Sequence, residues 1–349
     1  MNTEDKVRNS FFEQASICND LGSSFMFSLL EGLGRDLTYD TQSGSKVLNW
    51  QGDPHPKVDA LALRLVGAIH AIVRRGSFPE LEKYYDEPEK TPDENFIPLV
   101  LQAVEQHDEE VLSWLKFAPQ TNEVARSAVI FSVLLEITNR YQMPISLFEL
   151  GSSGGLNLQM AQFGFTFAGQ SYGKSDSILQ LQPDWEGGLP PNANVDVVHR
   201  QGCDLNPLSV LDEKHCEKLV AFLWPDQPMR IDRVRAAIEI AKQAPPQLDK
   251  SDAADWVENV FVNAETTGTV KVLFHTIAWN YFDPSSKKRI ETAVSNAGSK
   301  ASEENPLAWL TFEFEEDLQP RLRLRTWPEG EDEVLAQADP HVYKIVWEN

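Results

Sequence analysis

One short stretch, ISLFELGSSGGLN at residues 145–157, decides how the second half of the chain is interpreted. Its first six residues predict a buried strand, its glycines predict a tight turn, and the residues from Leu156 onward predict a helix. Glycines at such a turn let the backbone approach a ligand closely, and a helix start offers free N–H groups at the positive end of its dipole. The stretch therefore predicts a strand–turn–helix unit with a ligand at the turn. A tight turn without a ligand is the alternative.

This glycine turn departs from two common nucleotide-binding patterns. A dinucleotide site has Gly-x-Gly-x-x-Gly, and Ser153 stands at the second glycine position. A P-loop has Gly-Lys-Ser or Gly-Lys-Thr, and no lysine follows this turn. What the turn does have is an acidic residue, Glu149, two positions before Gly151.

Strand and helix patterns alternate from Pro144 onward, whereas the preceding residues have helical patterns. The alternation predicts crossover connections and a mainly parallel sheet. Two strands near residues 322–324 and 342–347, without a helix between them, predict an antiparallel pair at the sheet edge. The other predicted strands lie at 145–150, 195–198, 270–274 and 307–314, and the predicted helices lie at 58–75, 99–114, 121–140, 156–163, 231–242 and 285–297.

Composition and charge exclude several classes of protein. The 349 residues include 31 Lys and Arg against 53 Asp and Glu, and a net charge of −22 argues against a nucleic-acid partner and against a polybasic membrane anchor. No apolar run approaches the ~20 residues that span a bilayer, and the acidic first residues are unlike a signal peptide. Three cysteines without CxxC spacing indicate reduced thiols and no metal site. We therefore expect a cytoplasmic protein with a small-molecule partner; the oligomeric state is not predicted.

The glycine turn and Glu149 resemble motif I of the class I S-adenosylmethionine (SAM) methyltransferases. The resemblance implies that the turn lies beneath the methionine part of SAM and that the acidic residue acts near its amino group. The physical logic agrees, because SAM carries a sulfonium and an ammonium that a carboxylate would attract, while the helix start suits its carboxylate. The resemblance thus implies SAM as the cofactor.

Two later acidic residues extend the resemblance. Asp204 follows the strand pattern at 195–198 and resembles the acidic residue that holds the ribose hydroxyls. It lies 55 residues after Glu149, a long spacing that an insertion at about 165–194 would explain. Asp252 and Ala253 resemble the pair at the end of the third strand that contacts adenine. An Asx turn at Asp204 and a helix N-cap at Asp252 are the alternatives.

The end of the fourth predicted strand faces the transferred methyl group in class I enzymes. His275 is the expected general base there, because imidazole titrates near neutral pH. Tyr281 is expected to position the substrate, and Trp279 is expected to form an aromatic wall beside the sulfonium. The alternative is that these side chains are ordinary core residues.

Residues 120–126, 149–158, 202–207, 224–227 and 274–276 together resemble a bacterial family known as domain of unknown function 2332, which is grouped with the SAM-methyltransferase fold. The resemblance implies a fold and brings no settled reaction. The polar start of the helix at 121–140 would cover the SAM pocket in class I enzymes. Asn122 and Glu123 are therefore expected to contact substrate, and Arg126 is expected to help position it. Helix capping and a solvated Glu123–Arg126 pair are the alternative.

These expectations combine into one prediction. The fold is a class I SAM-methyltransferase (Rossmann-like) α/β fold with a seven-stranded mixed sheet at residues 145–349, preceded by an all-helical cap at 1–144. The function is methyl transfer from SAM to a small-molecule oxygen or nitrogen nucleophile. A non-catalytic SAM-fold binding or regulatory protein is the first alternative, and an NAD(P)-type Rossmann enzyme is the second. The residues expected to hold SAM are Glu149, Gly151, Ser152, Ser153, Gly154, Gly155, Asn157, Asp204, Asp252 and Ala253.

Overall fold

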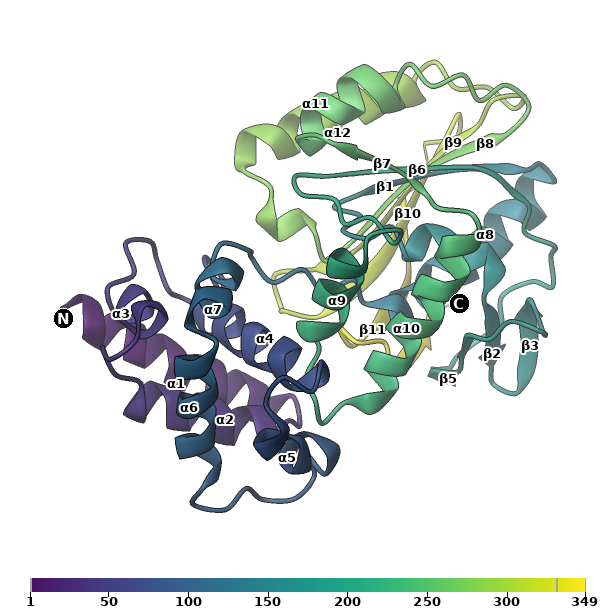
Figure 1. Ribbon diagram of the computed structural model, residues 1–349. Helices are drawn as coiled ribbons and strands as arrows, with labels where there is room; N and C mark the ends of the chain where they lie inside the picture. Colours follow the sequence, from purple (N-terminus) through teal and green to yellow (C-terminus); the bar gives the residue numbers. More distant parts are fainter. Residues whose placement is uncertain (1, 331, 349) are drawn as a thin grey trace. The chain divides into compact units, whose positions relative to one another are not determined.

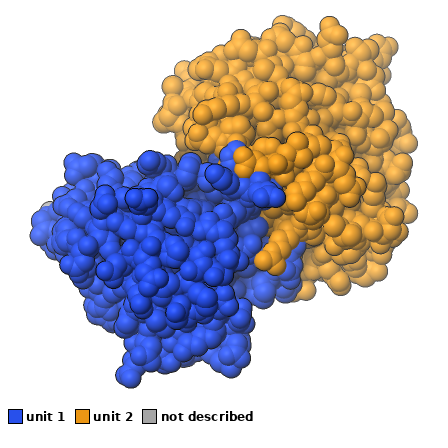
Figure 2. Space-filling view, in the orientation of Figure 1, with its two compact units in different colours: residues 1–121, 213–232 blue, residues 122–212, 233–349 orange. Residues whose placement is uncertain are grey.

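The computed structural model describes residues 2–330 and 332–348. It divides the chain into two compact units, coloured separately in Figure 2. Unit 1 comprises residues 1–121 and 213–232, and unit 2 comprises residues 122–212 and 233–349. The sequence placed the cap boundary at 144/145, whereas this division places residues 122–144 in unit 2 and adds a middle segment of the chain to unit 1.

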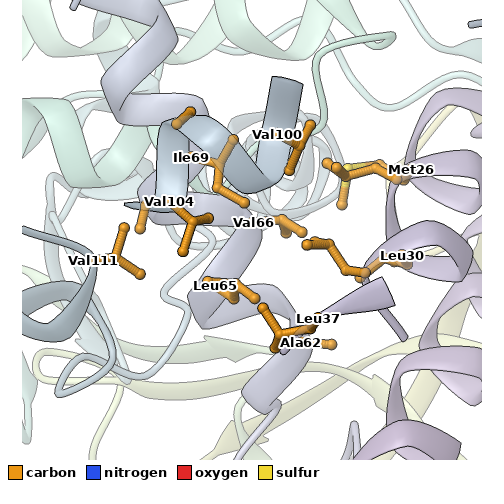
Figure 3. Close-up of a cluster of buried hydrophobic side chains, with 14 of the residues drawn as sticks. Met26, Leu30, Leu37, Ala62, Leu65, Val66, Ile69, Val100, Val104 and Val111 are labelled. Atoms are coloured by element: carbon orange, nitrogen blue, oxygen red, sulfur yellow. The ribbon is translucent and has the colours of Figure 1, made fainter. Parts of the chain in front are cut away.

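Unit 1 is helical, and apolar side chains from several of its helices form one core. Figure 3 shows part of this core, with Met26 and Leu30 of one helix gathered near Leu65 and Ile69 of another. The helices are α1 (Thr3–Asp20), α2 (Ser24–Asp36), α3 (Gln42–Leu48), α4 (Leu61–Arg74), α5 (Glu82–Asp86), α6 (Phe96–Gln106), α7 (Asp108–Trp114) and α9 (Glu213–Ala221), with the 3-10 turn η1 (Pro79–Leu81). Helix α10 (Pro228–Gln243) begins in this unit and continues in unit 2.

The single helix predicted at 99–114 is two helices, α6 and α7, separated at His107. The break has a physical reason. Asp108 is the first residue of α7, and its carboxylate accepts hydrogen bonds from the backbone N–H groups of Gln42 and Ser43 at 2.9 and 2.7 Å. It therefore satisfies donors at the start of α3 that a helix leaves unpaired.

The segment 213–232 is tied into unit 1 by polar and apolar contacts. The Asp226 carboxylate accepts hydrogen bonds from Ser23 Oγ at 2.7 Å and from the backbone N–H of Phe25 at 3.2 Å, at the start of α2. The ring of Phe222 lies where a side chain on Gly67 would stand, 2.7 Å from that ideal Cβ position. A glycine at position 67 is thus what allows this ring to pack against α4.

Unit 2 is built on a nine-stranded mixed sheet, so the mixed α/β class is confirmed and the prediction of seven strands is wrong. The sheet order is β5-β12-β11-β10-β9-β8-β1-β6-β7. The strands are β1 (Ile145–Leu150), β5 (Asp184–Glu186), β6 (Val197–Asp204), β7 (Gln247–Lys250), β8 (Val270–Thr276), β9 (Leu307–Phe314), β10 (Pro320–Trp327), β11 (Asp332–Ala338) and β12 (Lys344–Trp347). The two strands beyond the prediction are β11, whose largely half-buried residues give little apolar signal, and β5, which comes from the predicted insertion. The predicted antiparallel edge pair is wrong, because β11 lies between β10 and β12 and β5 forms the edge beyond β12.

The predicted insertion at about 165–194 forms a small sheet of its own before it reaches β5. That sheet has the order β3-β2-β4, with β2 (Gly164–Phe167), β3 (Gln170–Gly173) and β4 (Gln180–Leu181). Phe165 of β2 stacks on Phe131 of helix α8 (Ser127–Tyr141), with ring centroids 4.2 Å apart. Apolar packing therefore holds the inserted segment against helix α8.

The parallel part of the large sheet contains a change of direction in strand order. Strands β7, β6, β1, β8 and β9 are all parallel, and in chain order they read third, second, first, fourth, fifth. Such an order reverses between β1 and β8, and ligands of open α/β sheets bind at the carboxyl ends of the strands near that point. The glycine turn follows β1 and therefore lies at this reversal.

Helices cover both faces of this sheet, as Figure 1 shows. Helices α11 (Ala253–Trp256) and α12 (Pro284–Gly298) lie on one face, where the π-helical turn η4 (Val257–Phe261) continues α11. Helix α8 lies on the other face, against β8, β9 and β10. The short 3-10 turns η2 (Val124–Arg126), η3 (Asn157–Gln162) and η5 (Trp279–Tyr281) stand near the strand ends. No helix in residues 2–330 and 332–348 combines the length and the apolar character of a transmembrane span.

Candidate functional site

The turn after β1 depends on glycine at two positions. Gly151 and Gly155 both have φ near +66°, a region that glycine enters without a steric penalty. A Cβ on Gly151 would lie 2.9 Å from Ala278 Cβ, and one on Gly155 would lie 2.8 Å from Pro246 Cγ. The helix predicted at 156–163 is the 3-10 turn η3. The turn therefore brings its backbone close to neighbouring side chains and leads into a short 3-10 segment in place of the predicted helix.

Hydrogen bonds hold the glycine turn to the end of β6. The backbone N–H of Ser153 donates to Asp204 Oδ2 at 2.9 Å, and Ser152 donates to the Cys203 carbonyl from both its N–H and its Oγ. The other oxygen of Asp204 accepts from the backbone N–H of Asn206 at 2.8 Å, which is an Asx turn. One carboxylate oxygen of Asp204 therefore holds the glycine turn, and the other forms the Asx turn at residues 204–206.

Glu149, the next-to-last residue of β1, is a buried carboxyl group. Its side chain is 2 % exposed, and among the described residues its Oε2 has no hydrogen-bond partner. Burial raises the pKa of Glu149 well above its ordinary value, and the negative charge of Asp204 adds to the rise. A hydrogen bond with Asn157 and the positive charge of Arg126 act in the opposite direction. The group is therefore a carboxyl that a bound cation would favour in its charged form.

The residues just before α8 form one wall of this site. Asn122 Oδ1 accepts from the backbone N–H of Leu156 at 3.0 Å, directly after Gly155. Ser127 Oγ donates to Asn157 Oδ1 at 2.8 Å. Asn122 and Ser127 therefore contact the segment that follows the glycine turn.

Glu123 and Arg126 belong to the same wall. Glu123 is buried, and its Oε1 accepts from the backbone N–H of Ala125 at 3.3 Å, which caps η2. Arg126 donates from Nη1 to the Thr276 carbonyl and from Nε to the Pro340 carbonyl, both at 3.0 Å. These contacts hold both side chains in place, and Arg126 also acts electrostatically on Glu149.

Asp252 follows β7 and begins α11. Its Oδ1 accepts from the backbone N–H groups of Ala254 and Asp255 at 2.9 and 3.2 Å, so it is an N-cap, and Ala253 beside it is buried. The N–H of Ser251 donates to the Asp204 carbonyl at 3.1 Å. Glu149, Asp204 and Asp252 therefore stand at the ends of three adjacent parallel strands, beside the glycine turn.

His275 lies on the other face of the sheet from Glu149. Glu149 pairs with Phe274 in the β1–β8 register, so these two side chains share a face and His275 projects from the opposite one. There His275 Nδ1 lies 2.7 Å from Glu313 Oε1, and its ring stacks on Trp279 with centroids 5.0 Å apart. The structure brings His275 and Trp279 together, but it does not bring them to the face of Glu149.

Tyr281 lies in η5, two residues after Trp279, and is 77 % exposed. Glu313 and Trp309 are the side chains that sequence reasoning missed, although both line a cavity with His275. Their signal was available in the alternation of β9, where residues 309, 311 and 313 share one face. Glu313, a charged residue within this largely apolar strand, was the specific indication of a site residue. Metal-type clusters of three or more His, Cys, Asp or Glu side chains do not occur among the residues that the structure describes.

Substitution of Gly155 by alanine should destabilise the protein more than the same change at Gly268. Both glycines have positive φ, +66° and +75°, so each alanine costs about 1 kcal/mol of backbone strain. Only at Gly155 would the new methyl group also press on Pro246 and Leu248, because a Cβ at Gly268 meets nothing within 4 Å. Urea denaturation midpoints of the two variants measure the difference, and equal midpoints would contradict the close approach at Gly155.

A mixed sheet with a parallel part, helices on both faces and a glycine turn at its strand reversal defines an α/β protein. In a comparison with protein families, the model described as "Uncharacterized protein conserved in bacteria (DUF2332)" matches residues 8–347. The chain therefore belongs to this family, and the predicted family is confirmed. Searches of curated proteins and of solved structures found no match. The function is accordingly argued from the site.

Proposed function

We propose that this chain is a SAM-dependent methyltransferase that transfers a methyl group to an oxygen or nitrogen atom of a small molecule. The observation that carries the proposal is the row of three carboxylates, Glu149, Asp204 and Asp252, at the ends of adjacent parallel strands β1, β6 and β7. The row stands beside a glycine turn at the strand reversal, which is where α/β sheets bind ligands. The class I SAM-methyltransferase fold is part of the same proposal.

The side chains of the turn fit the charges of SAM. A buried carboxylate without a partner is unfavourable, and a bound ammonium or sulfonium group would supply the partner that Glu149 Oε2 lacks. The absence of a Cβ at Gly151 and Gly155 lets Ala278 and Pro246 pack directly against the backbone of the turn. When bound, SAM supplies an electrophilic methyl group.

Within this proposal each carboxylate has a separate role. Glu149 attracts the ammonium group, Asp204 holds the ribose hydroxyls, and Asp252 with the Ala253 backbone contacts adenine. A carboxylate can accept about four hydrogen bonds, so the bonds from Ser153 and Asn206 are compatible with a further one at Asp204. The floor consists of Ser152, Ser153, Gly154 and Asn157. Alignment of nucleophile and methyl group is the main contribution expected of the protein.

The acceptor side of the proposal assigns Asn122, Glu123, Arg126, Trp279 and Tyr281 to substrate and His275 to the base. His275 has the chemistry of a base, since Glu313 holds its Nδ1 and leaves Nε2 to accept a proton. Its position on the opposite face from Glu149 means that the acceptor would have to pass the end of β8. Strand geometry therefore favours the cofactor assignments over the assignment of the base.

Binding of SAM and of its demethylated product, S-adenosylhomocysteine, tests the proposal. We expect dissociation constants of about 1–100 μM by titration calorimetry, and weaker binding in Asp204→Ala. Isotope-labelled SAM incubated with small alcohols and amines should then yield labelled products. Absence of SAM binding at millimolar concentration would overturn the cofactor, and NADH binding in its place would support a dinucleotide enzyme.

A non-catalytic SAM-binding protein is the second candidate, and one observation favours it. Asp204 hydrogen-bonds to the glycine turn and Asp252 caps α11, so both residues have a structural role that does not depend on catalysis. SAM binding without methyl consumption across the panel of alcohols and amines would select this candidate.

A further inference from the structure

A second site lies on the face of the sheet that carries α11 and α12, away from Glu149. A cavity of about 450 Å³ opens there, within the size range of small-molecule sites. Strands β8, β9 and β10 and helix α12 contribute its lining, which includes His275, Trp279, Trp309, Glu313 and Arg325. The reaction proposed above uses His275, Trp279 and Glu313, and it assigns no role to Trp309 or Arg325.

Three buried polar atoms of this lining have no hydrogen-bond partner among the described residues. They are His275 Nε2, Trp309 Nε1 and Glu313 Oε2. Buried polar groups in folded proteins are nearly always paired, and each unpaired one costs about 1–3 kcal/mol. The gathering of His275 Nε2 and Trp309 Nε1 at one cavity points to a ligand that supplies partners for these two atoms.

The donor and acceptor character of these atoms defines part of the ligand. Glu313 Oε1 accepts from the backbone N–H of Ala278 at 2.9 Å and lies 2.7 Å from His275 Nδ1. In the tautomer in which His275 Nδ1 donates to Glu313 Oε1, Nε2 is an acceptor. Trp309 Nε1 is a donor. A hydroxyl group satisfies both, because it donates to His275 Nε2 and accepts from Trp309 Nε1.

An unpaired cation at the other side of the cavity defines a second group of the ligand. Arg325 stands directly across from Trp309 in the β9–β10 register, and its guanidinium stacks on Trp327 at 4.6 Å. Among the described residues Arg325 has no hydrogen bond or ion pair, whereas Arg321 and Arg323 on the same strand both pair with Glu315. A carboxylate is the natural partner of such a guanidinium.

The spacing of the two groups and the indole rings define what joins them. Strands β8 and β10 flank β9, so their backbones lie about 10 Å apart, and side chains from both reach into the cavity. Trp279 and Trp309, with centroids 6.0 Å apart, offer aromatic walls. We propose that this cavity binds a small aromatic carboxylate that carries a hydroxyl group at the end opposite the carboxylate. The binding is independent of SAM and goes beyond the proposed methyl transfer.

Titration calorimetry with 4-hydroxybenzoate tests this proposal, with benzoate and phenol as matched ligands that each lack one group. We expect 4-hydroxybenzoate to bind at least about tenfold more tightly than either, since benzoate offers no hydroxyl to His275 and Trp309 and phenol offers no carboxylate to Arg325. In ¹⁵N-labelled protein, the indole N–H signal of Trp309, assigned with Trp309→Phe, should shift on addition of 4-hydroxybenzoate.

The matched variants are Arg325→Gln and Arg321→Gln. Arg325→Gln should weaken 4-hydroxybenzoate about tenfold and leave phenol unchanged, whereas Arg321→Gln should change neither affinity. Equal affinities for the three ligands, equal effects of the two variants, or no binding at roughly 10 mM 4-hydroxybenzoate would each overturn the proposal. Because no arm contains SAM, these outcomes are separate from those of the methyltransferase test.

Discussion

Glu149→Gln is expected to stabilise the fold by about 1–3 kcal/mol at neutral pH while weakening SAM binding by about 100-fold. Glutamine keeps the shape of the side chain and the acceptor for Asn157, and it removes a charge that the folded protein buries without a partner at Oε2. The same change removes the charge that we propose attracts the ammonium of SAM. Opposite effects on stability and binding would distinguish a ligand-binding carboxyl from one that supports the fold.

The stability effect should depend on pH in a defined direction. Burial raises the pKa of Glu149, so the folded protein holds this proton more tightly than the unfolded chain does. Between the ordinary glutamate pKa of about 4.3 and the raised folded value, the unfolded state is already deprotonated, and wild-type stability falls as pH rises through this window. Below the window the group contributes no loss. The advantage of glutamine should therefore appear above about pH 4.3 and reach its maximum above the folded pKa.

Denaturant titrations of wild type and variant between roughly pH 4 and pH 8 measure this effect. Glu265→Gln is the control, because Glu265 is exposed and should show the same stability as wild type at every pH. Loss of several kcal/mol in Glu149→Gln would mean that the carboxylate is a partner in the fold. Unchanged SAM affinity would mean that Glu149 does not hold the cation.

The sequence predicted the elements whose signal is local. Strands β1 and β9 have the predicted ends, because proline precedes each largely apolar run and glycine (β1) or acidic residues (β9) follow it. The sequence also predicted the tight turn at Gly151 and Gly155, where the backbone has positive φ between the strand and the helical segment.

Features that depend on pairing between distant segments could not be predicted from local sequence patterns. The faces of Glu149 and His275 follow from one register, Glu149 opposite Phe274, which no local pattern reports. Strand β5 has three residues and joins the sheet only by pairing with β12. Likewise, Glu313 becomes a candidate site residue only when β9 pairs with β8 and places it beside His275.

Trp256→Ala is expected to lower the free energy of unfolding by about 3–5 kcal/mol, the cost of emptying a large buried aromatic site. Trp256 is 1 % exposed in α11, and its ring packs near that of Phe148 on β1, with centroids 6.1 Å apart. Its Nε1 also donates to Asp249 Oδ2 at 2.7 Å, on β7. Urea denaturation measures the loss, with Ile178→Ala as a control that should stay within about 0.5 kcal/mol, since Ile178 is 66 % exposed.

Trp256→Phe separates packing from the hydrogen bond at the same position. The phenyl ring retains most of the packing, and Asp249 Oδ2 keeps its bond from Gln201 Nε2 at 2.6 Å, so we expect a loss of only about 1–2 kcal/mol. A loss of stability in Trp256→Phe as large as that in Trp256→Ala would mean that the hydrogen bond to Asp249, and not packing, supplies the stabilising free energy. Because Trp256 joins the helix that Asp252 caps to both β1 and β7, either variant should also weaken SAM binding if Asp252 holds the adenine. Retention of full SAM affinity in a folded Trp256→Ala protein would therefore argue that the adenine contact lies elsewhere.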